Sequence, residues 1–240
     1  MTDAPKYKRI LLKISGESMS STGQFGIKAD AVSLVVGELR PLVEMGVQVG
    51  LVVGGGNFVR GRDLAGVPDI HRVTADYMGM LATVMNAIAL QDALESNGIP
   101  ARVLSALPMP QVCEPFVRRQ AVAHLETGRV VLLAGGTGSP FFTTDMCAAL
   151  RANEIAAEVL FKATKVDGVF DADPVKNPDA KKYDTLSYQK VLADRLGVMD
   201  LTAISMCMES RIPIVVFQLD KPGNLQAALA GKPVGTLIRE

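Results

Sequence analysis

Residues 129–145 have the sequence RVVLLAGGTGSPFFTTD, which changes character halfway along. Its first half is a short run of branched apolar residues, as in a strand buried on both faces of a parallel sheet. Glycines, hydroxyls and a proline follow, and Thr144-Asp145 stand ahead of a plausible helix. Glycine lets a ligand approach the backbone, and a helix N-terminus offers unpaired N–H groups to an anion. The segment predicts a site for a phosphorylated small molecule, although a glycine-rich connection without a ligand has the same local pattern.

The chain repeats this construction at two other predicted strands. Arg9–Ile14 ends at Ser15-Gly16, and Val47–Val53 ends at Gly54-Gly55-Gly56-Asn57. In open α/β sheets such turns meet at the carboxyl edge of the strands, where ligands bind. Strands and amphipathic helices alternate over the whole length, with Gly235–Arg239 as a closing edge strand. We therefore expect an α/β fold, a three-layer αβα sandwich with a central, mainly parallel sheet, in a single domain spanning 1–240.

Composition excludes several classes of protein. The chain has 240 residues, 48% of them hydrophobic, and 25 basic residues balance 25 acidic ones. A nucleic-acid or membrane surface usually leaves a basic excess, and no apolar run approaches the ~20 residues that span a bilayer. The three cysteines are dispersed, which argues against a disulfide framework and a zinc site. We expect a cytoplasmic protein that binds neither nucleic acid nor membrane.

A long helix is predicted from about Thr74, and it is apolar nearly all round. Leu81, Val84, Met85 and Ile88 follow the helical period, yet methionines and alanines occupy the other faces too. Such a helix is buried on several sides. It is either a central core helix or part of a subunit interface.

Two familiar phosphate-binding motifs are missing. No G-x-x-x-x-G-K-[ST] occurs, which excludes a P-loop enzyme. Gly54 and Gly56 lack the third glycine of the dinucleotide-binding motif, because Val59 occupies its position. These patterns argue against a dehydrogenase.

Charged residues near the glycine turns indicate phosphoryl transfer. Lys13 lies inside the first strand, Arg60 follows the triple glycine, and Lys162 ends the fifth strand. Two unit charges 4 Å apart repel by about 4 kcal/mol at an effective dielectric near 20, so facing phosphates need several cations and Mg²⁺. Asp145 could hold two lysines in place by remaining ionised between them. A Lys13 that only extends its ammonium along the sheet edge to solvent is the alternative.

With these residues the chain resembles the bacterial uridylate kinases, which belong to the amino acid kinase superfamily. The likeness covers almost the whole chain in order, and rests on Lys13–Glu17, Gly54–Asn57, Arg60-Gly61, Asp76–Asn86, Gly136–Asp145 and Lys162–Phe170. It implies the reaction ATP + UMP → ADP + UDP with Mg²⁺, in pyrimidine nucleotide synthesis. It also implies a homohexamer that GTP activates and UTP inhibits.

The resemblance also assigns roles to single residues. Catalysis would fall to Lys13, Arg60, Asp145 and Lys162, although Lys165 is an alternative to Lys162; no residue is assigned to a metal. The ATP site would comprise Lys13, Ile14, Ser15, Gly16, Gly56, Arg60, Thr164, Phe170 and Asp173. The UMP site would comprise Gly55, Asp76, Thr137, Gly138, Ser139, Pro140, Phe141, Phe142, Thr143 and Thr144. The segment tied to GTP activation would be Ser21, Thr22, Gly23, Gln24, Phe25 and Gly26.

Ser139 stands where the family more often has Asn, and Phe170 where Tyr is also common. Two rival functions share this fold: a kinase that phosphorylates a carboxylate or carbamate, and a nucleotide-binding storage or sensor protein. The context of Thr143-Thr144-Asp145 and Asp76 argues against the first, and the retained cations argue against the second.

Overall fold

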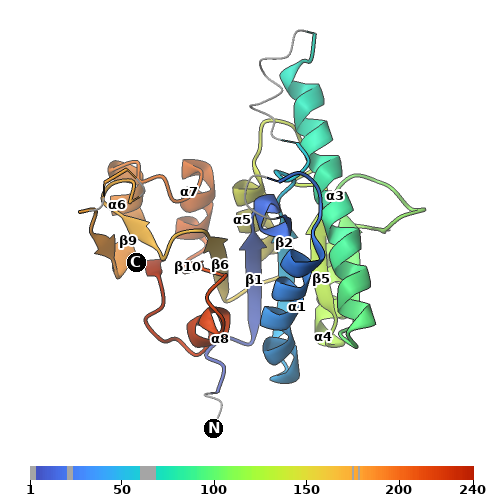
Figure 1. Ribbon diagram of the computed structural model, residues 1–240, viewed down its shortest axis with the longest axis horizontal. Coiled ribbons are helices and arrows are strands. Elements are labelled where there is room, and N and C mark those ends of the chain that lie inside the picture. Colours follow the sequence, from blue (N-terminus) through green and yellow to red (C-terminus); the bar gives the residue numbers. More distant parts are fainter. Residues whose placement is uncertain (1–3, 21–23, 60–68, 175, 178) are drawn as a thin grey trace.

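One nine-stranded sheet forms the centre of the computed structural model, with helices on both faces (Figure 1). The structure describes residues 4–20, 24–59, 69–174, 176–177 and 179–240. The strand order is β4-β3-β5-β2-β1-β6-β10-β11-β9, and every neighbouring pair is parallel except β10 with β11. The predicted three-layer α/β architecture with a mainly parallel sheet is confirmed.

The strands of this sheet are short and, at its centre, buried on both faces. Their bounds are β1 Arg9–Ile14, β2 Gln48–Val53, β3 Ala101–Ser105, β4 Glu114–Pro115, β5 Val130–Ala134, β6 Val159–Thr164, β9 Thr185–Ser187, β10 Ile214–Gln218 and β11 Thr236–Arg239. A separate hairpin pairs β7 Val169–Phe170 with β8 Lys182–Tyr183. Parallel strands whose two faces are covered by helices have continuous apolar sequences, as β5 has.

Two apolar layers cover the two faces. One contains α1 Ala29–Glu44, α3 Arg72–Ser96 and α8 Asn224–Leu229; the other contains α4 Arg118–Glu126, α5 Thr144–Glu154, α6 Tyr188–Ala193 and α7 Leu201–Glu209. A short 3₁₀ turn, η1, spans Gly16–Met19. Along β1, Ile10, Leu12 and Ile14 face the first layer while Leu11 faces the second. Because side chains alternate along a strand, Lys13 points to the same face as Leu11, toward the layer of α5.

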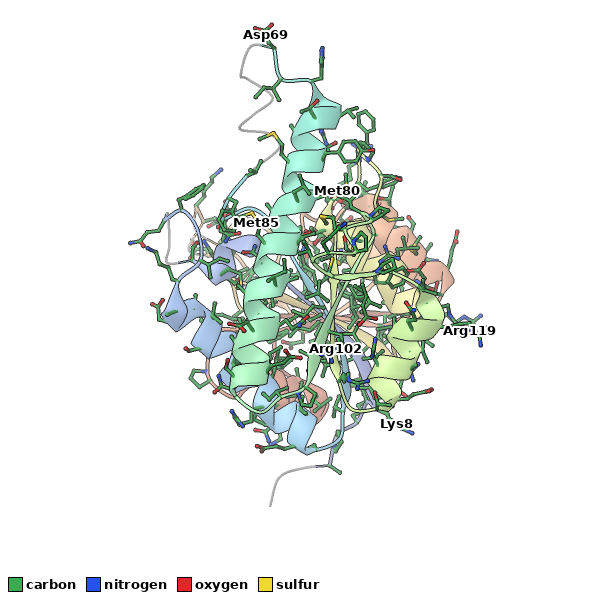
Figure 2. All side chains as sticks on the ribbon, turned by 90° about the vertical axis from the view of Figure 1, so that its right-hand side faces the viewer. Lys8, Asp69, Met80, Met85, Arg102 and Arg119 are labelled. Carbon is green, nitrogen blue, oxygen red and sulfur yellow. The ribbon has the colours of Figure 1, made fainter. Side chains whose placement is uncertain are left out.

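Helix α3 lies along one side of the molecule, and its N-terminal half extends past the carboxyl edge of the sheet (Figures 1 and 2). By length and composition it could cross a membrane, with a mean hydropathy of 1.3, and 44% of that apolar window is buried inside the protein. It packs on the sheet through residues such as Ala87, Leu90 and Leu94. Its apolar character is therefore at least partly that of a core helix.

Some elements differ from the sequence prediction. Strand β11 is not at the edge, because β9 pairs with it in parallel on its outer side. Val169–Phe170 forms half of a hairpin that no sequence pattern indicated. These differences leave the central strands unchanged.

Candidate active site

Two lysines on neighbouring strands meet at the carboxyl edge of the sheet. Lys13 on β1 and Lys162 on β6 are register partners, so their side chains leave the sheet on the same face. Each residue is only 9% exposed. An ammonium buried to this degree requires a counter-charge. The alternative in which Lys13 extends to solvent is therefore wrong.

Asp145 provides the counter-charge from the first turn of α5. Lys13 Nζ lies 2.8 Å from Asp145 Oδ1, and Lys162 Nζ lies 2.8 Å from Asp145 Oδ2. The Lys162 contact is an aligned hydrogen bond, whereas Oδ1 accepts none and meets Lys13 as an ion pair. Lys162 Nζ also donates to the carbonyl of Val198. The carboxylate thus holds both ammonium groups at fixed positions.

Burial and charge act in opposite directions on these groups. Burial raises the pKa of Asp145, but the close positive charges of Lys13 and Lys162 outweigh it, and the pKa lies below the usual value. Burial lowers the pKa of Lys162, partly offset by the attraction of Asp145. The carboxylate is therefore ionised, and the cluster keeps a net positive charge that can face an anion.

The first two glycine turns touch one another beside this cluster. A methyl group on Gly16 would lie 2.4 Å from Gly56 N and 2.6 Å from Gly54 O. Ile14, which has a fully buried side chain, accepts a hydrogen bond from Gly54 N at 3.0 Å. Gly16 and Gly54 are thus required by the close approach of the two loops, and a ligand is not needed to explain them.

Buried polar side chains of α3 hold the turns in place. Asn86 donates to Gly54 O at 2.7 Å and exchanges hydrogen bonds of 2.7 and 2.9 Å with the side chain of Asn57. Thr83 Oγ1 accepts from Gly135 N at 2.9 Å, in the third turn. The helix therefore fixes the second and third glycine turns relative to each other.

A cavity of about 430 Å³ opens between these turns and α3. Its lining includes many residues expected at the phosphates and at UMP: Lys13, Ser15, Gly55, Gly56, Asp76, Phe142, Thr143 and Thr144. Glu17, Arg72, Met80, Thr83 and Gly136 also line it, among others. The remaining residues of the expected UMP segment, 137–141, continue the same loop beyond these walls.

Asp76 holds that loop in the present structure. Its Oδ2 accepts from Phe141 N at 2.8 Å, and Arg72 Nε bonds both carboxylate oxygens at 2.9 and 3.0 Å. Phe141 has φ of +71°, an unusual conformation for a residue with a side chain. Inside the loop, Thr137 Oγ1 donates to Ser139 O at 3.1 Å. Asp76 is thus a carboxylate of the cavity wall that also shapes the loop opposite.

Hydrogen bonds connect helix α5 to both the start and the end of this loop. Thr143 is its N-cap, accepting from Asp145 N at 3.1 Å and donating to Asp200. Arg151, only 4% exposed, lies 3.6 Å from the ring centre of Phe116 and donates to Gly136 O at 3.4 Å.

A second cavity of about 490 Å³ is lined by residues of β6, β7 and β10 and by the segment 194–198. Thr164, Phe170 and Asp173, the three residues expected to hold the adenosine of ATP, line it together with this segment. Val198 lines this cavity and bonds the ammonium of Lys162, which connects the cavity to the cluster. The Thr164 hydroxyl donates to Val166 O at 2.6 Å, so only its lone pairs are available to a ligand.

Lys165, the alternative second lysine, lies elsewhere. Its Nζ is 2.7 Å from Glu17 Oε2, and its side chain is 56% exposed. Lys162, and not Lys165, is therefore the lysine that shares Asp145 with Lys13.

Some expected residues fall outside the described part of the chain. Arg60 and Ser21, Thr22 and Gly23 are among them. Of the rest of the GTP segment, Gly26 exchanges hydrogen bonds with Asn57, and the Phe25 ring meets Phe58 edge-on at 5.5 Å. That part of the segment contacts the second glycine turn.

Sequence reasoning did not assign Thr83, Asn86, Arg72 or the segment 194–200 to the site. A polar residue inside an apolar helix was the signal available for Thr83 and Asn86, because a buried amide or hydroxyl must find a partner. No local pattern marked 194–200, which reaches the lysines only through the packing of α6 and α7.

Comparison with known proteins adds independent findings. Residues 8–218 match the model of the amino acid kinase family. The crystal structure of UMP kinase from Bacillus anthracis is 36% identical, with a TM-score of 0.93, and the match covers 97% of this chain and 96% of that one. UMP kinase from Ureaplasma parvum is 33% identical, with a TM-score of 0.91 and coverage of 98% and 100%. Uridylate kinase from Archaeoglobus fulgidus is 30% identical, with a TM-score of 0.73 and coverage of 95% and 99%.

Proposed function

This chain belongs to the amino acid kinase family, and from that premise we propose that it transfers the γ-phosphoryl group of ATP to UMP, giving ADP and UDP. One observation carries the proposal: Lys13, which lines the first cavity, and Lys162, which bonds Val198 in the wall of the second, share Asp145. A phosphoryl donor and a phosphorylated acceptor must face each other across such a positive cluster.

The chain's own residues supply position and charge. Lys13 and Lys162 stabilise the negative charge that develops on the transferred group, and Asp145 keeps them from moving apart. Asp145 is already ion-paired on both oxygens, so it acts by positioning and not as a general base. The acceptor oxygen of UMP is itself a phosphate oxygen, ionised at neutral pH, and needs no base.

Mg²⁺ is part of the proposal as the partner of ATP. Its positive charge would offset part of the repulsion between the facing phosphates. Among the described residues, no three His, Cys, Asp or Glu side chains converge on a metal-sized site. Mg²⁺ commonly keeps water ligands and binds through substrate phosphates, so delivery as the ATP complex fits these residues.

In the acceptor cavity, Asp76 is the carboxylate that would accept from the ribose hydroxyls of UMP. The loop 137–144 would surround the uracil, and its backbone would supply the base contacts where Ser139 replaces the more usual Asn. In the donor cavity, Phe170 would form an apolar wall for adenine. Arg60 remains the predicted further cation at the phosphates.

Regulation and assembly belong to the same proposal. GTP activation would act through Ser21–Gly26, because Gly26 and Phe25 contact the second glycine turn; inhibition by UTP would follow from its likeness to UMP. A homohexamer would bury the exposed apolar side chains of α3, among them Leu81 and Met85. A role in pyrimidine nucleotide synthesis and a cytoplasmic location complete the proposal.

The test is ADP formation from ATP and Mg²⁺ with UMP, CMP, acetylglutamate or carbamate as acceptor. We expect turnover with UMP at least about a hundredfold above the others, since a site that hydrogen-bonds one base rejects another strongly. Preference for acetylglutamate or carbamate would favour the rival kinase. Nucleotide binding by calorimetry without any turnover would favour the storage or sensor protein.

A further inference from the structure

Thr236, the first residue of β11, inserts its hydroxyl into the hairpin that borders the donor cavity. Asp171 N donates to Lys181 O at 3.1 Å, a regular bond of the antiparallel pair. Two residues back, where Val169 N–H should reach the carbonyl of Tyr183, the Thr236 hydroxyl lies between them. Its Oγ1 accepts from Val169 N at 2.8 Å and donates to Tyr183 O. Thr236 is fully buried, so its hydroxyl has the hairpin backbone as its partner.

Two glycines make room for this insertion. Gly168 has φ of +124°, and a methyl group there would lie 2.6 Å from Thr236 Oγ1. Gly235 has φ of +70°, and a methyl group there would lie 1.9 Å from Val216 O. A side chain at Gly168 would push the hairpin away from Thr236, and one at Gly235 would push the start of β11 away from β10.

Ion pairs support the same hairpin on its outer side, next to Gly168. Asp167 Oδ2 lies 3.2 Å from Lys182 Nζ, on β8, and 3.6 Å from Lys221 Nζ, which follows β10. A buried hydroxyl and a partly exposed pair of ion contacts thus tie the hairpin to the main sheet, in addition to the packing of Val169 and Tyr183 in the second apolar layer. The residues just beyond it, Phe170 to Pro174, form a wall of the second cavity.

We infer that Thr236 is a positioning residue for the phosphoryl donor: its hydroxyl sets the angle at which the 169–183 hairpin presents Phe170 and Asp173 to the second cavity. This rests on the proposed function insofar as that cavity takes ATP. The hydroxyl is buried and is not part of the lining of the second cavity, so it acts through the hairpin backbone. Donor affinity should therefore depend on a residue near the end of the chain, while affinity for UMP should not.

The test compares Thr236→Val, which keeps the shape and removes the hydroxyl, with Thr236→Ser, which keeps the hydroxyl. Calorimetry on the full chain with Mg-ATP alone should show about tenfold weaker binding for Thr236→Val, because a buried N–H and a carbonyl lose their partner. Thr236→Ser should bind like the wild type. Affinity for UMP should change by less than about twofold in both.

Amide hydrogen exchange gives a readout independent of ligand. In Thr236→Val the amides of 169–171 should exchange faster, whereas those of β1 should not. Thr185→Val, the same change on the exposed neighbouring strand β9, is the matched control and should alter neither measurement. Asp167→Asn tests the charged support without touching the core and should weaken ATP binding about threefold.

The inference is overturned if Thr236→Val binds ATP like the wild type, if Thr236→Ser loses as much as the valine variant, or if UMP affinity falls equally. It is also overturned if Thr236→Val does not fold and Asp167→Asn binds ATP normally. A failure of the proposed function looks different: the wild type would bind ATP, and Thr236→Val would still show weaker binding and faster exchange, yet the wild type would form no UDP.

Discussion

At the scale of single residues, the balance of charge around Asp145 decides what the site can do. One carboxylate stands against two buried ammonium groups, so the cluster has one positive charge in excess among these three side chains. Neither lysine can approach a phosphate freely, because each is held 2.8 Å from a carboxylate oxygen. This fixed geometry suits a reaction in which charge moves between two bound groups and little else changes.

Lys13→Ala should lower kcat by about 10²- to 10³-fold, the usual effect of removing one fixed group that stabilises transition-state charge. KM for UMP should change by less than about threefold, since the lysine acts mainly on charge that develops during transfer. Steady-state kinetics with ATP and UMP would measure both constants. Lys165→Ala is the matched control, and kcat should remain within about threefold because that lysine pairs with Glu17 at the surface. Equal losses in kcat and in UMP affinity would contradict this role of Lys13.

Asp145→Asn should lower the free energy of unfolding by about 3 kcal/mol near pH 7, because it leaves two buried ammonium groups without a counter-charge. The folded-state pKa of Asp145 is lowered: burial alone would raise it, but Lys13 and Lys162 more than compensate. Its stabilisation is therefore complete above the unfolded pKa near ~4 and is lost as the pH falls through the lower folded pKa. Urea unfolding of both proteins between pH 7 and pH 3 would measure the difference. A difference that does not shrink at the acid end would contradict the assignment.

At the scale of elements, α3 determines how closely the glycine turns approach one another. Gly55 packs on the N-terminal half of the helix, where a methyl group would lie 2.6 Å from Gly79 O and 2.8 Å from Ala82 Cβ. Gly79, on the same helix, has open space where its methyl group would be. Gly55→Ala and Gly79→Ala should therefore change the stability of the protein in opposite directions.

Gly55→Ala should lower the midpoint of thermal unfolding and weaken UMP binding, because the second turn must move away from α3. A loss of about 1–3 kcal/mol in unfolding free energy is typical of a clash in a packed region. Gly79→Ala should instead raise stability by up to about 1 kcal/mol, since alanine is the better helix former. Thermal and urea unfolding of the two variants would measure the signs. Equal destabilisation by both would show that the contact at Gly55 does not limit the packing.

Sequence alone located the central elements well and the peripheral ones poorly. Strands β1 and β5 have the predicted bounds, because a buried parallel strand is a continuous apolar run with a charged or glycine boundary. The β7–β8 hairpin was missed because each strand has two residues, and its support comes from Thr236 far along the chain. The edge position expected for β11 was wrong for a related reason: its pairing with β9 leaves no trace in its own residues.

The same division applies to the site. Lys13, Asp145 and Lys162 could be found from sequence because a charge in or beside an apolar strand is unusual and requires a partner. Their contacts through Val198 and Asp200 could not, since these depend on how α6 and α7 pack on the sheet. The choice between Lys162 and Lys165 needed coordinates, because three residues along a strand and its turn reverse the direction of the side chain.

At the scale of the whole molecule, the exposed face of α3 is the main feature that a single chain does not explain. Along this helix Tyr77, Leu81, Met85 and Ile88 recur at helical spacing, and each is 38 to 50% exposed. Figure 2 looks onto this side of the molecule, with Met85 labelled on the helix. Apolar patches of this kind usually mark an interaction surface. The single domain expected from the sequence stays a prediction, supported by the one continuous sheet.

If the proposed hexamer forms through this face, Leu81→Glu should reduce it to smaller species, because a charge placed in an apolar interface must be desolvated without a partner. Light scattering after size exclusion, at a fixed protein concentration, would measure the mass of wild type and variant. Leu34→Glu on α1 is the matched control: Leu34 is 40% exposed and Leu81 46%, but only Leu81 belongs to the α3 face. We expect Leu34→Glu to keep the wild-type mass.

Comparing the two variants distinguishes a leucine in a subunit interface from one that is merely exposed to solvent. If the wild type is monomeric, or if both glutamate variants retain its mass, the α3 face is not the interface and the proposed hexamer loses its structural support. If only Leu81→Glu dissociates and UMP turnover falls with it, the assembly also supports the site, because α3 carries both the exposed face and the residues Thr83 and Asn86 that hold the glycine turns. Dissociation without loss of turnover would instead show that each chain is active alone, and that the interface matters only for regulation.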